Sequence, residues 1–453
     1  MATAELTYSY LSPSSVEFGD GRSDVTLATS GGREAHPHFF TGFLEQPRQT
    51  AQALLAVAEV ARTRYYEPPQ MIAARIAAAD PVVTSNLDRL RFESFSACAG
   101  VYARLDLEPG VLEERPQNWG TTNVDFNPPM RAALARVREA DSMLMNVGHD
   151  EVVVTTLEGS TVEKKVPLPD RWVKGFAEVQ VASSRMVLRH ELPTIEARRF
   201  LQSLPRAKSR AVAWATPVGK TLRLASRADD SSVCLAGPER LRLLEKLLPF
   251  TKSLRIYGPA PDRDHSAAPS AWELVLDGAR AVFVLSPELF RGFSGEGGVL
   301  SDLSAADEET IESVADHLHG EPEIDPTAVA HELGVARTSV QTALGALSAA
   351  GRVGFDLASG AFFHRELPYD RSVLDKMHPR LLAARKLVDE GAVVLDESGE
   401  GASVRSGEAE YRVRFEDGVA RCTCAWFARH RGERGHCKHV LAVEQVRRTV
   451  RVP

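Results

Sequence analysis

The chain is poor in cysteine and has no long apolar run. Its 453 residues include only five cysteines. Three of them, Cys422, Cys424 and Cys437, cluster near the C-terminal end, whereas Cys98 and Cys234 stand alone. An odd number distributed in this way argues against a disulfide framework and indicates a reducing compartment. No stretch of about 18 apolar residues occurs, so we expect no membrane span.

A targeting segment and an overall positive charge are also missing. Residues 1–14 have neither a basic region nor an apolar core, so no signal peptide is predicted and we expect a cytoplasmic protein. The net charge of −7 excludes a general attraction to nucleic acid, and any such contact must be local. Lys and Arg are absent between Arg291 and Arg337, while ten Asp and Glu residues lie between Glu296 and Asp325. This shift predicts an acidic linker at 296–308.

Length and composition indicate a multidomain globular protein. A chain of 453 residues exceeds one ordinary core, and 43% hydrophobic with 25% charged residues is typical of folded proteins. We expect an α+β fold with antiparallel hairpin-helix units, a winged-helix-like domain and a small C-terminal zinc finger. Residues 1–149 are predicted to be mostly helical. Apolar residues recur at helical spacing between Glu45 and Tyr65, and a second helix is expected at about 69–79.

Hairpin-then-helix units are predicted to recur three times in an α+β region at 150–295. Alternating apolar and polar residues indicate hairpins within 151–166, 221–235 and 272–285, and the second is followed by a helical pattern at 240–248. A nucleotide site is excluded in this region. The dipeptide Gly219-Lys220 ends like a phosphate-binding loop, but Trp214 lies where that loop needs glycine, and a strand pattern follows.

Three helices and a hairpin are predicted at 309–368, the winged-helix-like domain. Asp325-Pro326 is a favoured helix start, a capping residue followed by proline. A third helix is expected from Arg337 to near Gly351, and 352–364 has the pattern of a two-stranded wing. Phosphate contacts need Lys or Arg, and the third helix carries only Arg337 at its start. Packing or protein docking is therefore favoured over DNA reading.

The last segment, residues 371–453, is predicted to combine an amphipathic helix with a metal site. The candidate ligands are three thiols and one imidazole, Cys422, Cys424, Cys437 and His439. Zn²⁺ favours sulfur and imidazole nitrogen in a tetrahedron, and four protein ligands leave no position open for catalysis, so a structural site is expected. His430 and His436 are alternative fourth ligands, although the two-plus-two spacing favours His439.

The ligand order resembles that of the SWIM zinc finger, whose pattern is Cys-x-Cys, a variable gap and Cys-x-His. The resemblance covers a core at 408–446, with a strand before the first pair and a helix after the second. Bacterial stand-alone members, often encoded beside MoxR-type AAA ATPases and von Willebrand factor A proteins, are most similar in layout. Residues 290–297 are also similar to that group. The resemblance implies Zn²⁺ as cofactor and a role in binding protein or DNA.

A local basic surface is predicted around the finger. Residues 401–453 contain eleven Arg and Lys against six Asp and Glu. The candidate contact residues within the ligand gap are Trp426, Arg429, Arg431 and Arg434. Arginine interleaved with aromatic residues can bind nucleic acid, but a basic patch can equally dock an acidic protein surface.

The expected role is binding and not catalysis. The leading interpretation is an adaptor that docks a protein partner, which by resemblance would be an AAA ATPase or a von Willebrand factor A protein. The alternative is a nucleic-acid-binding protein that uses the basic finger and the winged helix. An enzyme that uses Asp125 or its neighbours is disfavoured, because no nucleophile–base pair or open metal site supports it.

Overall fold

The chain is described by a computed structural model, which covers the following residues: 15–19, 22–27, 38–65, 81–116, 118–123, 126, 128–148, 170–209, 211–261, 265–288, 292–295, 297, 299–300, 307–318, 321–367, 378–397, 400–416, 419–432 and 434–451. The helix expected at about 69–79, the hairpin expected within 151–166 and the candidate Asp125 lie outside the described residues.

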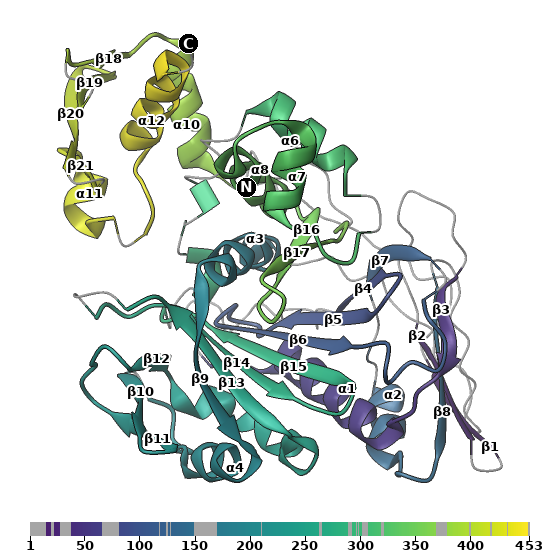
Figure 1. Ribbon diagram of the computed structural model, residues 1–453. Helices are drawn as coiled ribbons and strands as arrows, with labels where there is room; N and C mark the ends of the chain where they lie inside the picture. The colour runs from purple at the N-terminus through teal and green to yellow at the C-terminus, as the bar shows by residue number, and fades with distance from the viewer. Residues whose placement is uncertain are drawn as a thin grey trace.

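An eight-stranded antiparallel sheet forms the centre of the molecule (Figure 1). Its strand order is β7-β4-β5-β6-β15-β14-β13-β9. The first half comprises β4 (Val82–Asn86), β5 (Leu90–Phe95), β6 (Val101–Leu107) and β7 (Trp119–Asn123). The second half comprises β9 (Met186–Pro193), β13 (Ser253–Pro259), β14 (Ser270–Val275) and β15 (Ala279–Leu285). The halves meet where β6 pairs with β15.

One face of this sheet is apolar and is covered by three helices and two small sheets. The helices are α1 (Pro47–Arg62), α4 (Thr194–Ser203) and the 3-10 helix η2 (Pro238–Phe250). One small sheet contains β1 (Ser15–Gly19), β2 (Arg22–Leu27), β8 (Ser142–Gly148) and β3 (His38–Phe43), with α2 (Pro128–Arg136) beside it; the other contains β11 (Thr221–Ala225), β10 (Val212–Val218) and β12 (Val233–Ala236). Phe200 of α4 stacks on the buried Trp272, with ring centroids 5.7 Å apart.

The opposite face is covered by α3 (Asp170–Ser184) and by a helical unit. The helical unit consists of α6 (Glu308–Asp316), α7 (Pro326–Leu333), α8 (Arg337–Ala349) and the hairpin β16 (Val353–Asp356)–β17 (Ala361–His364). These elements agree with the helices and hairpin expected within 309–368. Asp325 caps α7 as its side chain accepts a hydrogen bond from the Thr327 amide at 2.9 Å.

Every residue of the strands β16 and β17 is buried, because the hairpin lies on the charged face of the central sheet (Figure 1), and only its turn, residues 358–360, is exposed. Strands β5 and β6 place the alternating residues Arg91, Glu93, Arg104 and Asp106 on that face, and each of them is at most 1% exposed. Asp356 of the hairpin accepts hydrogen bonds from both terminal nitrogens of Arg280, at 2.8 and 2.7 Å. It also lies 3.2 Å from Arg104.

A second set of bonds joins the end of the hairpin to the sheet. Arg365 donates to Glu93 at 2.7 Å, and both side chains are fully buried. Asn86 of β4 donates to the His364 carbonyl at 2.7 Å. Paired buried charges confer geometric specificity, and the removal of one partner leaves the other uncompensated. The contact between the helical unit and the sheet is therefore specific, and removal of any single charged partner should lower the free energy of unfolding.

Two of the expected regions differ from the structure. Residues 1–149 were expected to be mostly helical, but their described part has eight strands and two helices, α1 and α2. Strands β4, β5 and β6 lie in this region, and every one of their residues is buried. In the 150–295 region the expected β14–β15 hairpin forms, but β15 is followed only by the short 3-10 helix η3 (Gly292–Gly295). The hairpin expected within 221–235 does not form, because its two strands, β11 and β12, lie on opposite sides of β10 and pair with it instead of with each other.

The dipeptide Gly219-Lys220 lies in the turn between β10 and β11, with Gly219 at φ +63°. Strand β11 follows it directly, as the sequence pattern predicted. Among the described residues, no helix has the length and apolar character needed to cross a membrane.

The chain ends in a C-terminal module, residues 378–451, drawn in yellow-green and yellow in Figure 1. It contains α10 (Pro379–Asp389), the sheet β18 (Val393–Leu395)–β19 (Gly401–Ser406)–β20 (Ala409–Glu416)–β21 (Val419–Cys422), α11 (Ala425–His430) and α12 (Lys438–Arg451). Its core joins α10 and α12 to the inner face of this sheet.

Candidate metal centre

The four predicted ligands come from a strand end and two helix starts. Cys422 is the last residue of β21. Cys424 caps α11, and its sulfur accepts a hydrogen bond from the Phe427 amide at 3.4 Å. Cys437 directly precedes α12, and His439 lies in the first turn of that helix. A helix N-terminus carries partial positive charge, which stabilises a thiolate placed there.

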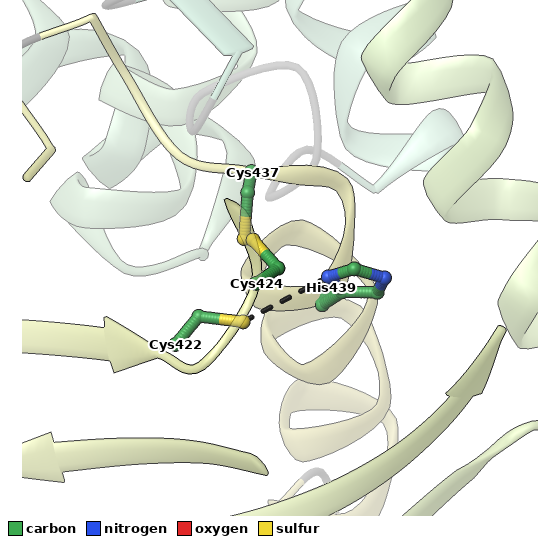
Figure 2. Close-up of side chains that lie close together, drawn as sticks. All are labelled: Cys422, Cys424, Cys437 and His439. Atoms are coloured by element: carbon green, nitrogen blue, oxygen red, sulfur yellow. Dashed lines mark hydrogen bonds between the residues drawn. The ribbon is translucent and has the colours of Figure 1, made fainter. Parts of the chain in front are cut away.

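The structure brings these four side chains together (Figure 2). All are buried, and their ligand atoms lie within 4.8 Å of one another. The Cys422 sulfur is 3.7 Å from His439 Nδ1. Zinc bonds of about 2.3 Å to sulfur and about 2.0 Å to nitrogen place tetrahedral ligands roughly 3.6 to 3.8 Å apart. The cluster therefore has the size and the donor set of a Cys₃His zinc site.

The electrostatics of the cluster also favour a cation. A hydrogen bond between Cys422 and Cys437 raises the pKa of the Cys422 thiol and lowers that of Cys437. Burial raises the pKa of Cys424. Three sulfurs this close cannot all carry negative charge in a buried site without a compensating positive ion. Zn²⁺ supplies that charge and converts all three thiols into thiolates.

His439 is oriented to bind metal through Nδ1. Its ring stacks on Tyr411 of β20, with centroids 4.2 Å apart and planes 21° apart. The opposite nitrogen, Nε2, is buried and has no hydrogen-bond partner among the described residues. Packing against Tyr411 therefore fixes the ring. The sequence contained no sign of this role of Tyr411, which alternates with arginines like any half-buried strand residue.

The two alternative histidines have other contacts. His436 Nδ1 lies 3.1 Å from the Glu444 carboxylate, which is the first cause of its raised pKa. The His430 ring packs on Trp426 at 4.3 Å. Neither belongs to the group of four ligands. The two-plus-two pattern thus identified the clustered set.

The four predicted contact residues lie in two different environments. Arg429 and Arg431 are exposed. Trp426 is half-buried, and the guanidinium group of Arg380 lies 4.5 Å from its ring centroid. Arg434 is half-buried as well and lies 5.8 Å from the same ring. The exposed pair is therefore accessible to a partner, whereas Trp426 packs within the C-terminal module.

Arg380 has a structural role that the sequence did not indicate. It is the second residue of α10, and its guanidinium group donates to the carbonyl oxygens of Arg434 and His436, each at 2.8 Å. It thereby fixes the loop that leads to Cys437. In the sequence it is one Arg among many, 57 positions before that ligand, so only the folded chain associates the two.

One comparison with known proteins matches this region. Residues 411–447 match the family model of the SWIM zinc finger. No curated protein matches the chain. Solved structures that match include a chain of the PCNA2–PCNA3 complex from Sulfolobus tokodaii, with 11% identity, a TM-score of 0.36, and coverage of 55% of this chain and 100% of that chain. The proliferating cellular nuclear antigen of Entamoeba histolytica matches with 7% identity, a TM-score of 0.32, and coverage of 55% and 99%.

These two structural similarities are too weak to support a conclusion about this chain. The finger is established by the family match together with the buried Cys₃His cluster. The C-terminal part of the chain therefore carries a SWIM zinc finger at residues 411–447, with Cys422, Cys424, Cys437 and His439 in place to bind Zn²⁺.

Proposed function

We propose that this chain is a non-catalytic adaptor whose zinc finger docks a protein partner. The observation that carries the proposal is the closed site. Four buried ligands lie together, enough to fill all four positions of a tetrahedral zinc ion, so the ion would stabilise the finger and present no open position to a substrate. The partner that the SWIM resemblance implies is an AAA ATPase or a von Willebrand factor A protein. The exposed Arg429 and Arg431 favour an acidic surface on that partner.

Nucleic acid is the second candidate partner, and the same two exposed arginines are the observation in its favour. The helical unit adds little support. A wing that reads DNA must be accessible and basic, but both strands of the β16–β17 hairpin are buried against the central sheet, and the exposed turn, Ala358-Ser359-Gly360, carries no Lys or Arg. At the start of α8, Arg337 is exposed together with Thr338, whereas the exposed charged residues of α6 include the acidic Glu308, Glu309 and Glu312. A nucleic-acid contact would therefore depend chiefly on the finger.

Charge reversal at the exposed pair tests both candidates. We expect the double variant Arg429→Glu, Arg431→Glu to reduce capture of the partner from a lysate of the source organism by roughly tenfold or more, because opposed charges become like charges. The measurement is quantitative recovery on the immobilised full chain. Nuclease treatment distinguishes the partners, since a protein partner remains and a nucleic-acid partner is lost.

A matched control is available on the central body. Arg223 and Arg227 are also exposed, and their reversal to Glu makes the same change of net charge. Equal loss in both variants would show that net charge alone governs binding and would contradict a site on the finger. If nucleic acid is bound, the dependence of log affinity on log salt should weaken by about 1 for each arginine that contacts phosphate.

A further inference from the structure

The C-terminal module contacts the central body through a segment that lies in the chain between η3 and α6, here called the connecting segment, of which Gly297, Val299 and Leu300 are described. Val299 packs with Ala177 and Val181 of α3, and its amide donates to the buried Glu178 of the same helix at 3.4 Å. Leu300, the next residue, belongs instead to the core of the C-terminal module. The adjacent side chains of Val299 and Leu300 thus pack into two different cores, that of the central body and that of the C-terminal module.

Two glycines, Gly297 of this segment and Gly435 of the finger, lie against each other where the two parts meet. Gly297 has φ +72° and Gly435 has φ +71°, a region that favours glycine. A Cβ on Gly435 would lie 2.3 Å from the Gly297 carbonyl oxygen, and a Cβ on Gly297 would lie 2.9 Å from that of Arg434. The two backbones therefore touch directly, and any side chain at either position would separate them.

The finger half of this crossing lies in the stretch between two zinc ligands. Gly435 is two residues before Cys437 and follows α11, which Cys424 caps. Arg380 holds the same stretch, by its bonds to the carbonyls of Arg434 and His436, and its guanidinium group also contacts the Gly297 position. Ligation of Cys424 and Cys437 fixes both ends of the stretch, so the surface that Gly297 meets depends on the metal.

We propose that zinc occupancy controls whether the C-terminal module is docked on the central body. With zinc bound, residues 434–436 have the conformation that receives Gly297 and Arg380, and the module has one position relative to α3. Loss of zinc frees this stretch at both ends and releases the connecting segment from the finger. The chain thereby converts metal binding into a change in domain arrangement. This does not depend on which partner the finger binds.

Hydrogen exchange on the full-length protein tests the proposal. In the wild-type chain, removal of zinc with a chelator should raise exchange not only in the finger but also in residues 177–181 of α3. The expected increase there is roughly tenfold, the factor that loss of one or two net hydrogen bonds produces in a local opening. Chelation that changes exchange only within 378–451 would overturn the proposal.

The variant Gly297→Ala should separate docking from metal binding. Its new Cβ would lie 2.6 Å from the Arg380 guanidinium and 2.9 Å from the Arg434 carbonyl, and the change leaves the finger sequence intact. We expect one equivalent of zinc, a protected finger and α3 exchange equal to that of the chelated wild type. Gly407→Ala is the control, since Gly407 also has positive φ, +67°, but nothing lies within 4 Å of its Cβ position.

A second variant, Arg380→Ala, removes the bonds to residues 434 and 436 from the other side. It should likewise retain zinc and raise α3 exchange roughly tenfold, because the stretch loses two accepted hydrogen bonds. If both zinc-loaded variants keep wild-type protection in α3, the docking contacts described here do not hold the module. Direct measurement of bound zinc in each sample distinguishes undocking from metal loss.

Discussion

The change Cys437→Ser should remove zinc and unfold the finger while the central body remains folded. A structural zinc ion contributes roughly 10 to 16 kcal/mol of apparent binding free energy in zinc-finger peptides at neutral pH, and that free energy is folding free energy. With one thiolate missing, the other three ligands cannot complete the tetrahedron around the ion. We expect less than one equivalent of zinc, loss of exchange protection between 408 and 451, and unchanged protection in the central sheet.

The matched control for this change is Cys234→Ser. Cys234 is also a buried free thiol, but it lies on β12, in the small sheet beside α4, and outside the metal cluster. The control should keep a full equivalent of zinc. Retention of one equivalent by the Cys437→Ser protein would refute the ligand assignment.

The change Asp356→Ala should cost about 3 to 5 kcal/mol of unfolding free energy, the range for breaking a buried ion pair from one side. The Asp356 carboxylate binds Arg280 through two hydrogen bonds and lies 3.2 Å from Arg104, and none of the three side chains is more than 6% exposed. Without it, two buried guanidinium groups lose their shared partner. Urea denaturation with the sheet and the helical unit monitored separately would measure the loss.

Glu323→Ala provides the control, because Glu323 also pairs with an arginine, Arg89 between β4 and β5, but is 48% exposed. Exposed pairs contribute about 0 to 1 kcal/mol, so little change is expected. An equal, small effect of both substitutions would contradict a structural role for the buried network.

Acid should weaken the same contact. Burial alone would raise the pKa of Asp356, but the guanidinium groups of Arg104 and Arg280 outweigh burial and hold this pKa well below its usual range. A carboxyl with a depressed folded-state pKa stabilises the protein above its unfolded value of about 3.9, and this contribution is lost as pH falls through the folded value. The stability advantage of the wild type over Asp356→Asn should be constant near pH 7 and shrink below about pH 4. An advantage at pH 2 as large as that at pH 7 would contradict this sign.

The metal site was predictable because its information is local. The four ligands lie within 18 residues, their chemistry is specific for zinc, and a strand and a helix deliver them in the expected order. The capped helix at Asp325-Pro326 and the β14–β15 hairpin around Asp277-Gly278 were predictable for the same reason. In each case neighbours in sequence determine the geometry.

The charged face of the central sheet could not be predicted in this way. Arg91, Glu93, Arg104 and Asp106 alternate with apolar residues, a pattern typical of a strand with one face in water. All four are buried, and three of them have partners some 250 to 270 residues further along: Asp356 of the hairpin pairs with Arg91 and Arg104, and Arg365 after the hairpin pairs with Glu93. No local rule contains that pairing. The environment of Trp426 was hidden likewise, since Arg380 reaches it from another helix.

The distance in sequence between the two sides of this contact has a consequence during synthesis. Arg104 leaves the ribosome 252 residues before Asp356, its partner in the hairpin. Translation proceeds at about 5 to 20 residues per second, so the charged face of the sheet is synthesised on the order of 10 to 50 seconds before the hairpin that covers it. An apolar face exposed for that time would invite aggregation, whereas a face of mixed charges stays hydrated. The same arginines and carboxylates whose burial is costly in the folded protein thus keep this face of the nascent chain hydrated, and so disfavour aggregation, until the hairpin has been synthesised.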